Sequence, residues 1–331
     1  MSSLRPSSVC DTTPLQRLES QSSSSEPSSP TSSTLNENQQ NFKVNLSMKM
    51  DMQGKRTIWL RVLLDALILI CVVLPIIYFC VWGVPYKRGF FCDDASLKHP
   101  YRSSTLKSWM LYLTGIALPI IAIEFFKSNE KKMQGINNLS DTRYYFWHLE
   151  IPDWIVECYQ KIGLLIFGIG VGQLTTDIAK YSIGRYRPHF FAICQPFMSD
   201  GTTCDDASNA GHYIENFECM GHDVTPRMLK QVALSFPSGH AVFSSYTMIY
   251  IVIYLQTNMT WPRSKMFKHL LQFLFLMFAW YTALTRVSDF KHHWTDVLAG
   301  SAIGTIYALM LVMLWKQFEE TISFNYYQFE G

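Results

Sequence analysis

The sequence predicts an all-α integral membrane protein with six transmembrane helices, and three observations carry this prediction. Hydrophobic residues make up 48% of the 331 residues and charged residues only 16%, whereas an average soluble domain has about 25% charged residues. The apolar residues are clustered in six runs with few or no charges, and a membrane span takes roughly 20 such residues. A long polar loop, residues 181–236, separates the third run from the fourth.

The six runs are residues 66–86, 108–126, 162–176, 241–262, 269–285 and 297–315. The third run is the shortest, and the residues before it could extend it. A soluble protein with buried helices is the alternative, but six such runs in one chain argue against it.

The two ends of the chain are more polar than the runs. Residues 22–33 are only Ser, Pro, Thr and Glu, a composition that cannot bury enough apolar surface to fold. We therefore expect a disordered, Ser/Pro-rich cytoplasmic tail at 1–55, a six-helix membrane domain at 56–318 and a short cytoplasmic tail at 319–331. No hydrophobic stretch opens the sequence, so we expect no cleavable signal peptide. The net charge of +2 gives no reason to expect a nucleic-acid partner.

Six spans place both chain ends on one side of the membrane and loops one, three and five on the other. Four cysteines fall on this odd-loop side: Cys92, Cys194, Cys204 and Cys219. Disulfides among them would need an oxidising compartment, although their pairing stays open. The N-x-Ser/Thr sites at Asn45, Asn138 and Asn258 are on the other side and favour the reverse orientation. We favour odd loops that are extracellular or lumenal.

Three polar clusters stand at the ends of the predicted spans. The first leaves the third span and contains Lys180 and Arg187. Their spacing of seven residues would place both on one face if the helix continued for two more turns. The alternative is an ordinary basic helix end that reaches the lipid headgroups.

The second cluster opens the fourth span and reads Pro-Ser238-Gly239-His240. A helix N-terminus offers free N–H groups to an anion, Ser238 adds a hydroxyl, and Gly239 permits close approach of the backbone. His240 could donate a proton. The alternative is an ordinary helix start with Ser at the cap.

The third cluster precedes the sixth span and contains Arg286, His292, His293 and Asp296. His292 and Asp296 are four residues apart, so on a helix they would share a face, and the carboxylate would fix the tautomer of a nucleophilic imidazole. Arg286 offers a fork that matches phosphate oxygens. His293 would point away from His292, so we leave it out of the chemistry. The alternative is a surface pair at the membrane boundary.

Together the clusters are more specific than any one of them. Because loops three and five lie on the same side, three cations, a helix N-terminus and two imidazoles can converge on one pocket. This set suits phosphoryl transfer, in which charge develops on the phosphate oxygens. The sequence has no carboxylate cluster for magnesium and no zinc-ligand spacing, so we expect no metal and no cofactor.

These clusters resemble the type 2 phosphatidate phosphatase superfamily, whose pattern is K-x6-R-P, P-S-G-H and S-R-x5-H-x3-D. The matching residues are 180–188, 237–240 and 285–296, with Thr285 in place of the leading Ser. Their flanks, and the segment 85–94, are similar to animal lipid phosphate phosphatases, including the Wunen type. The resemblance runs from about residue 58 to 315.

The resemblance implies metal-independent hydrolysis of lipid phosphate monoesters: phosphatidate, lysophosphatidate, sphingosine 1-phosphate and ceramide 1-phosphate. It implies that His292 forms a phosphohistidine, Asp296 orients it, and His240 is the acid and base. The implied phosphate ligands are Lys180, Arg187, Ser238, Gly239 and Arg286. It also implies a multi-pass protein, with the plasma membrane favoured, an extracellular or lumenal site, and a role in lipid signalling. Relatives can dimerise, so a homo-oligomer is an expectation.

Three other readings compete with this one. A catalytically silent relative that binds or presents lipid would be expected to have lost motif residues, and this sequence keeps them. A lipid headgroup transferase would use another acceptor instead of water, but the first cluster and loop one favour hydrolysis. A vanadium haloperoxidase has a similar three-part site but is soluble.

Overall fold

The computed structural model describes residues 55–134, 143–146, 149–221, 224–259 and 265–330. All of them belong to one compact unit, Gly54–Gly331. The predicted tail, residues 1–55, lies outside the described residues except for its last residue.

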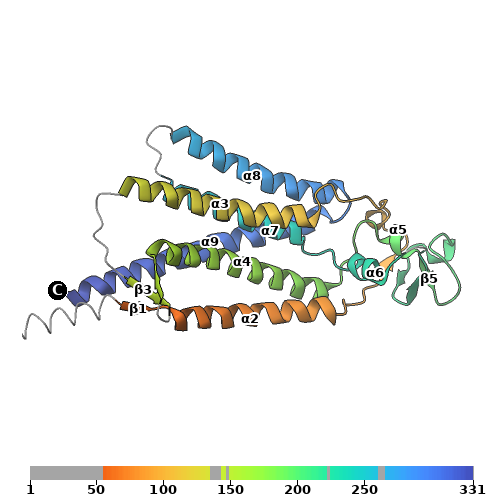
Figure 1. Cartoon of the computed structure of the whole chain (residues 1–331). Helices are drawn as coiled ribbons and strands as arrows, with labels where there is room; N and C mark the ends of the chain where they lie inside the picture. The colour runs from red at the N-terminus through yellow and green to blue at the C-terminus, as the bar shows by residue number, and fades with distance from the viewer. Residues whose placement is uncertain (1–54, 135–142, 147–148, 222–223, 260–264, 331) are drawn as a thin grey trace, which may run out of the picture. The chain divides into compact units, whose positions relative to one another are not determined.

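Long helices make up most of this unit (Figure 1). They are α2 (Trp59–Val81), α3 (Ser108–Gln134), α4 (Asp153–Ile183), α7 (Gly239–Asn258), α8 (Lys265–Ser288) and α9 (Trp294–Glu330). Five of these helices, all except α7, are long and apolar enough to cross a membrane. The prediction of an all-α integral membrane protein is therefore confirmed.

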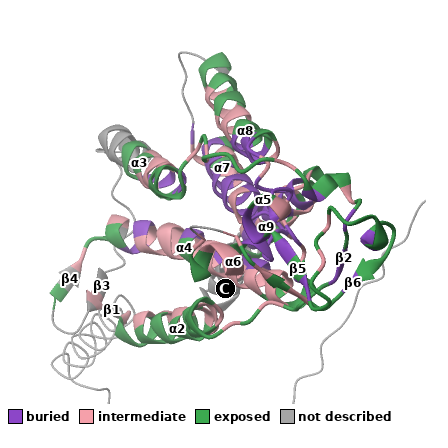
Figure 2. Cartoon of the chain, turned by 90° about the vertical axis from the view of Figure 1, so that its right-hand side faces the viewer, coloured by how far each residue is buried: buried purple, intermediate pink, exposed green. Residues whose placement is uncertain are grey.

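Helix α7 corresponds to the fourth predicted span, but it is less apolar than the other five. It carries four hydroxyl residues in a row, 244–247, and it packs against α3, α4, α8 and α9. Figure 2 shows how much of α7 is buried. The hydroxyls of Tyr246 and Tyr250 donate hydrogen bonds to carbonyls of α4, at 3.1 and 2.8 Å. Polar residues are tolerated in an interior helix because protein, not lipid, surrounds it and supplies hydrogen-bond partners.

Helix α9 lies very close to α7 because glycines face it. A Cβ atom built on Gly300 would lie 2.6 Å from the carbonyl oxygen of Ser238, and one on Gly304 would overlap α7 in the same way. Small residues at such positions let two helix backbones approach each other. This contact brings the start of α9 next to the start of α7.

Several helix ends differ from the predicted spans. Helix α4, predicted as the weakest span, is 31 residues long and includes Lys180. Asp177 and Lys180 end the apolar run in the sequence, but they line a polar cavity and the helix continues through them. Helix α9 continues to Glu330, so the predicted C-terminal tail, 319–331, begins as part of this helix.

A small polar cap covers one end of the helices. It contains α5 (Phe190–Cys194), α6 (Pro226–Val232) and two antiparallel strand pairs, β2 (Phe90–Phe91) with β6 (Tyr213–Ile214) and β5 (Pro196–Met198) with β7 (Phe217–Cys219). Two short 3₁₀ turns, Ala95–Leu97 and Ala207–Asn209, complete it. Figure 1 shows α5, α6 and β5 beyond the end of α2.

Two disulfides hold the cap together. Cys92 pairs with Cys204, which joins loop one to loop three, and Cys194 pairs with Cys219 within loop three. The aromatic rings of Phe90, Tyr186 and Phe190 pack in the core beneath them. The structure thus supplies the pairing that the sequence left open.

A second small sheet, not predicted from the sequence, lies at the other end of the helices. Strand β3 (Arg143–Phe146) pairs with β1 (Lys55–Thr57) in parallel and with β4 (Leu149–Ile151) antiparallel. The sheet is remote from the polar clusters, which gather at the capped end.

Candidate active site

A cavity of about 420 Å³ opens at the capped end of the bundle. It is lined by residues from the ends of α2, α3, α4, α7 and α8 and from the segment that precedes α9. The predicted site residues among them are Lys180, Arg187, Gly239, His240, Arg286 and His292. The three sequence clusters therefore meet at one place.

The first cluster reaches the cavity by a turn and not along a helix. Helix α4 ends at Ile183, and Gly184 follows with a left-handed φ of 59°, its N–H donating to the carbonyl of Lys180 at 3.0 Å. The helix does not continue to Arg187, so the condition for Lys180 and Arg187 to share one helix face is not met. A backbone hydrogen bond of 2.9 Å to the carbonyl of Val232 holds Arg187 in place instead.

Arg187 places a guanidinium at the cavity. Its Nε is buried and has no hydrogen-bond partner among the described residues. Burial, followed by the nearby charge of Arg286, lowers the pKa of the Arg187 guanidinium to about 10. The group stays charged at neutral pH, and a buried donor without a partner is costly unless a ligand satisfies it.

The second cluster places a helix start beside Lys180. Ser238 is the N-cap of α7, and its Oγ is buried without a partner among the described residues. A Cβ atom built on Gly239 would lie 3.3 Å from Lys180 Nζ, so glycine leaves room for the ammonium at the helix N-terminus. His240 Nε2 lies 3.4 Å from Ser108 Oγ. This end of α7 therefore offers unpaired donors to an anion.

The third cluster supplies a buried guanidinium at the end of α8. Arg286 is 1% exposed and donates to Asp289 Oδ2 at 3.2 Å and to the carbonyl of Leu106 at 3.2 Å. It also donates to Thr285 Oγ1 at 3.1 Å. Thr285, the one departure from the sequence pattern, thus keeps the hydroxyl that positions the arginine.

His292 lies before α9 and is oriented by a backbone carbonyl. Its Nδ1 is 2.7 Å from the carbonyl oxygen of Ser235, which can only accept, so Nδ1 carries the proton and the Nε2 lone pair is free. Because α9 starts at Trp294, the expectation that His292 and Asp296 share a helix face is wrong. The carboxylate of Asp296 is 4.0 Å from Nδ1.

Asp296 is held behind His292 by other groups. It is fully buried and accepts from Ser235 Oγ at 2.6 Å, from Arg185 Nη1 at 2.5 Å and from the N–H of His293 at 3.1 Å. Its backbone carbonyl accepts from the N–H of Ser238 at 3.0 Å. Asp296 therefore joins the starts of α7 and α9.

Electrostatics keep the His292 imidazole neutral. Burial lowers its pKa well below the usual value, and the charges of Arg187 and Lys180 lower it further. A neutral imidazole with a free lone pair is the form that can attack phosphorus.

Several residues at the site were not predicted. His189, whose Nδ1 donates to the carbonyl of Phe290 at 2.7 Å, and Lys291, whose Nζ is 3.7 Å from the ring centre of Tyr101, both line the cavity. Ser235 lies two residues before the second motif and Asp289 lies inside the third. Their places in the motifs could have drawn attention to them, but no spacing rule assigns them a contact.

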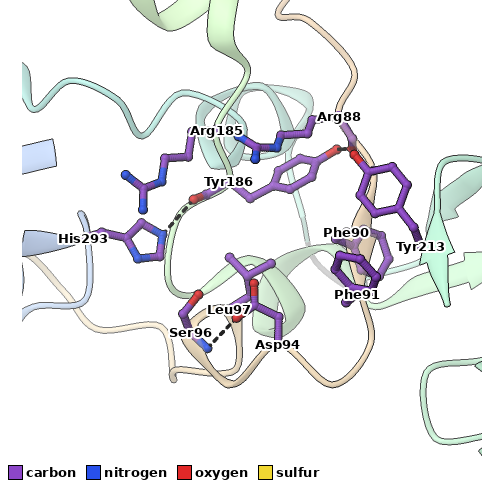
Figure 3. Close-up of a pocket in the computed structure, with 11 residues that line it drawn as sticks. Arg88, Phe90, Phe91, Asp94, Ser96, Leu97, Arg185, Tyr186, Tyr213 and His293 are labelled. Atoms are coloured by element: carbon purple, nitrogen blue, oxygen red, sulfur yellow. Dashed lines mark hydrogen bonds between the residues drawn. The ribbon is translucent and has the colours of Figure 1, made fainter. Parts of the chain in front are cut away.

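His293 was left out of the chemistry, and the structure places it in another cavity. Its Nε2 donates to the carbonyl of Tyr186 at 3.1 Å, and with Arg185 and Asp94 it lines a space of about 180 Å³ (Figure 3). Within the described part of the chain, no three His, Cys, Asp or Glu side chains are grouped so that they could hold a metal ion.

Comparisons with known proteins identify the family of the chain. The family model of the PAP2 superfamily matches residues 161–320. A putative phosphatidate phosphatase of Drosophila melanogaster is 57% identical over 263 residues, which cover 78% of this chain and 69% of that protein. Phospholipid phosphatase 1 of Rattus norvegicus is 37% identical, covering 80% and 88%, and phospholipid phosphatase 2 of Homo sapiens is 33% identical, covering 78% and 84%. No solved structure matches. The chain therefore belongs to the PAP2 superfamily, in the branch of the lipid phosphate phosphatases.

Proposed function

We propose that this enzyme hydrolyses lipid phosphate monoesters through a phosphohistidine on His292, without a metal ion. The observation that carries the proposal is the single cavity that gathers Lys180, Arg187 and Arg286 around the imidazoles of His240 and His292. Phosphate oxygens gain charge during transfer, and fixed cations in a site of low dielectric stabilise that charge strongly.

In the first step, His292 Nε2 attacks phosphorus and the bond from phosphorus to the lipid oxygen breaks. His240 gives its proton to that oxygen, and the lipid leaves as an alcohol. In the second step, a water oxygen attacks phosphorus, His240 takes the proton of this water, and the N–P bond breaks. The products are the lipid alcohol and inorganic phosphate.

The phosphate ligands have separate tasks. Lys180, Arg187 and Arg286 carry the charge, whereas Ser238 Oγ and the N–H of Gly239 add hydrogen bonds at the α7 N-terminus. Ser238 Oγ and Arg187 Nε are buried without a hydrogen-bond partner in the part of the chain that the structure describes, which supports this assignment.

Asp296 acts on His292 from behind. It holds the Ser235 hydroxyl, and the Ser235 carbonyl in turn fixes the Nδ1 proton of His292. At 4.0 Å, its charge also stabilises the cation that forms when the imidazole is phosphorylated. We assign it a positioning role.

The proposed substrates are phosphatidate, lysophosphatidate, sphingosine 1-phosphate and ceramide 1-phosphate. They would be presented from the extracellular face of the plasma membrane, the favoured location, or from the lumenal face of an internal membrane. The disulfides Cys92–Cys204 and Cys194–Cys219 at the capped end support this orientation. Hydrolysis of lipid phosphate added to intact cells, without permeabilisation, tests the sidedness.

The test of the mechanism uses the purified full-length chain and radiolabelled lipid monophosphates. His292→Gln should lower phosphate release below about one thousandth of wild type, as expected for loss of a nucleophile, and should abolish an acid-labile, base-stable labelled protein. His212→Gln is the matched control, because this histidine is exposed in the cap. Wild-type activity should persist in excess chelator. Full activity of His292→Gln, or a chelator loss that magnesium restores, would overturn the proposal.

A further inference from the structure

One carboxylate lines the cavity of the candidate active site, although its negative charge would repel a bound phosphate. Asp177 is the one Asp or Glu among the described residues that line the cavity. A negative charge near a bound phosphate dianion weakens its binding. Asp177 must therefore serve something other than the phosphate.

The contacts of Asp177 leave it able to bind a ligand. Gln173 Nε2 donates to both carboxylate oxygens at 2.9 Å, and Gln173 also lines the cavity. Lys180 is one turn away, but no ion pair within 4.0 Å joins these two described residues. Two carboxylate oxygens accept about four hydrogen bonds, so capacity remains after the bonds from Gln173.

The position of Asp177 matches the part of a substrate next to its phosphate. Lys180 lies at the α7 N-terminus beside Gly239, where the phosphate is expected. Asp177 is three residues earlier on α4, about 4.5 Å closer to the middle of the membrane along the helix axis. The chains of a lipid must extend in that direction, so the second carbon of its headgroup passes this residue.

We propose that Asp177, supported by Gln173, binds a hydrogen-bond donor on the second carbon of the substrate, an ammonium or a hydroxyl. The inference rests on the proposed function and names the substrates that the site favours. Sphingosine 1-phosphate carries an ammonium there and lysophosphatidate a hydroxyl. Phosphatidate has an ester at that carbon and no donor.

The test compares kcat/KM for sphingosine 1-phosphate and phosphatidate in one purified preparation. A charge-assisted hydrogen bond contributes about 1.5–3 kcal/mol, so Asp177→Asn should lower the ratio of the two kcat/KM values about 10- to 100-fold. The loss of kcat/KM for lysophosphatidate should lie between the losses for the other two lipids. Asp177→Glu should restore part of the ratio. Glu124→Gln, a matched change at an exposed carboxylate of α3 outside the cavity, should leave the ratio unchanged.

Competition by inorganic phosphate separates recognition from a structural role. Inorganic phosphate has no second carbon that could carry a donor to Asp177, so it should inhibit the Asp177→Asn variant at the same or a lower concentration than it inhibits wild type. If the variant binds inorganic phosphate less tightly, or loses activity equally on both lipids, Asp177 acts by holding Lys180 and the proposal falls. If wild type releases phosphate from neither lipid, the proposed function itself is wrong.

Discussion

Asp289 joins two parts of the active site that are 184 residues apart in the chain. Its carboxylate accepts from the N–H and the hydroxyl of Thr105 at 2.8 and 2.7 Å, and from Arg286 Nη2 at 3.2 Å. Loop one is thereby attached to the cation at the end of α8. We predict that Asp289→Asn misplaces Arg286 and lowers activity without removing any group from the cavity.

The size of the effect follows from these contacts. An Asn side chain has one acceptor oxygen where Asp289 uses two, so the hydrogen bond at the other position would be lost or reversed, and Arg286 would lose its buried counter-charge. A hydrogen bond to a charged group contributes about 1.5–3 kcal/mol, which corresponds to an approximately 10- to 100-fold lower kcat/KM at about 1.4 kcal/mol for each factor of ten. Breaking a buried ion pair also costs roughly 3–5 kcal/mol of stability.

The assay measures phosphate release and thermal unfolding on the same preparations. Thr105→Val removes one hydroxyl and keeps the backbone donor, so it should cost about 1 kcal/mol and lower kcat/KM roughly fivefold. Asp205→Asn, at an exposed carboxylate of the cap, is the matched control and should change neither quantity. Wild-type kcat/KM in Asp289→Asn, with the expected loss of Tm, would refute the idea that this carboxylate positions Arg286.

Three further predictions follow from the cavity and its cap. Gly239→Ala should raise KM about tenfold, because its Cβ would press on Lys180 Nζ at 3.3 Å and weaken one charged hydrogen bond. Burial, followed by the charge of Arg187, lowers the pKa of Lys291 to about 8, so KM should rise above pH 8 as this cation loses its proton, and Lys291→Met should remove that rise. Replacing Cys92 and Cys204 together by Ser should lower stability by about 2–5 kcal/mol, measured as Tm.

Each of these predictions has an outcome that contradicts it. An unchanged KM in Gly239→Ala would mean that Lys180 moves aside freely. For Lys291, the free energy of unfolding should change with pH in the opposite direction to substrate affinity. The pKa of Lys291 in the folded state is lower than its ordinary value of 10.5, so above about pH 8 the folded state binds fewer protons than the unfolded state. Stability therefore increases as pH rises from about 8. A Lys291→Met profile identical to wild type would show that another group titrates there. An unchanged Tm after loss of the Cys92–Cys204 bond would show that strand pairing alone holds loop one.

The sequence predicted what depends on local patterns. The six runs marked the helices because a span needs consecutive apolar residues, and the three motifs marked Lys180, His240 and His292 because their neighbours fit helix ends. Hydropathy could not show that α7 is the interior helix, since its tyrosine and serine hydroxyls lower its apolarity and are satisfied only by tertiary contacts. The third run is shorter than its helix for a related reason, because Asp177 and Lys180 interrupt the apolar sequence but face a cavity.

The contacts between motifs could not be predicted from spacing. The interval between His292 and Asp296 suggested a direct hydrogen bond on a helix. Instead the helix starts two residues later, and a carbonyl from the α6–α7 connection, that of Ser235, takes that place. Likewise, Gly184 ends α4 before Arg187. Both outcomes depend on how loop three returns to the bundle, a long-range fold that no local rule encodes.

The placement of the carboxylates explains how a cavity so rich in cations can form in an apolar bundle. Asp289 pairs with Arg286, the negative charge of Asp296 favours the charged form of Arg187, and neither carboxylate lines the cavity. At an effective dielectric of about 20, opposite charges 4 Å apart attract by about 4 kcal/mol, so these two carboxylates offset part of the repulsion among the cations. Because the counter-charges are behind the cations, the face toward the phosphate remains positive. Asp177 is the exception, because it does line the cavity. It lies on the membrane side of Lys180, where we propose that it contacts the lipid next to the phosphate and not the phosphate itself.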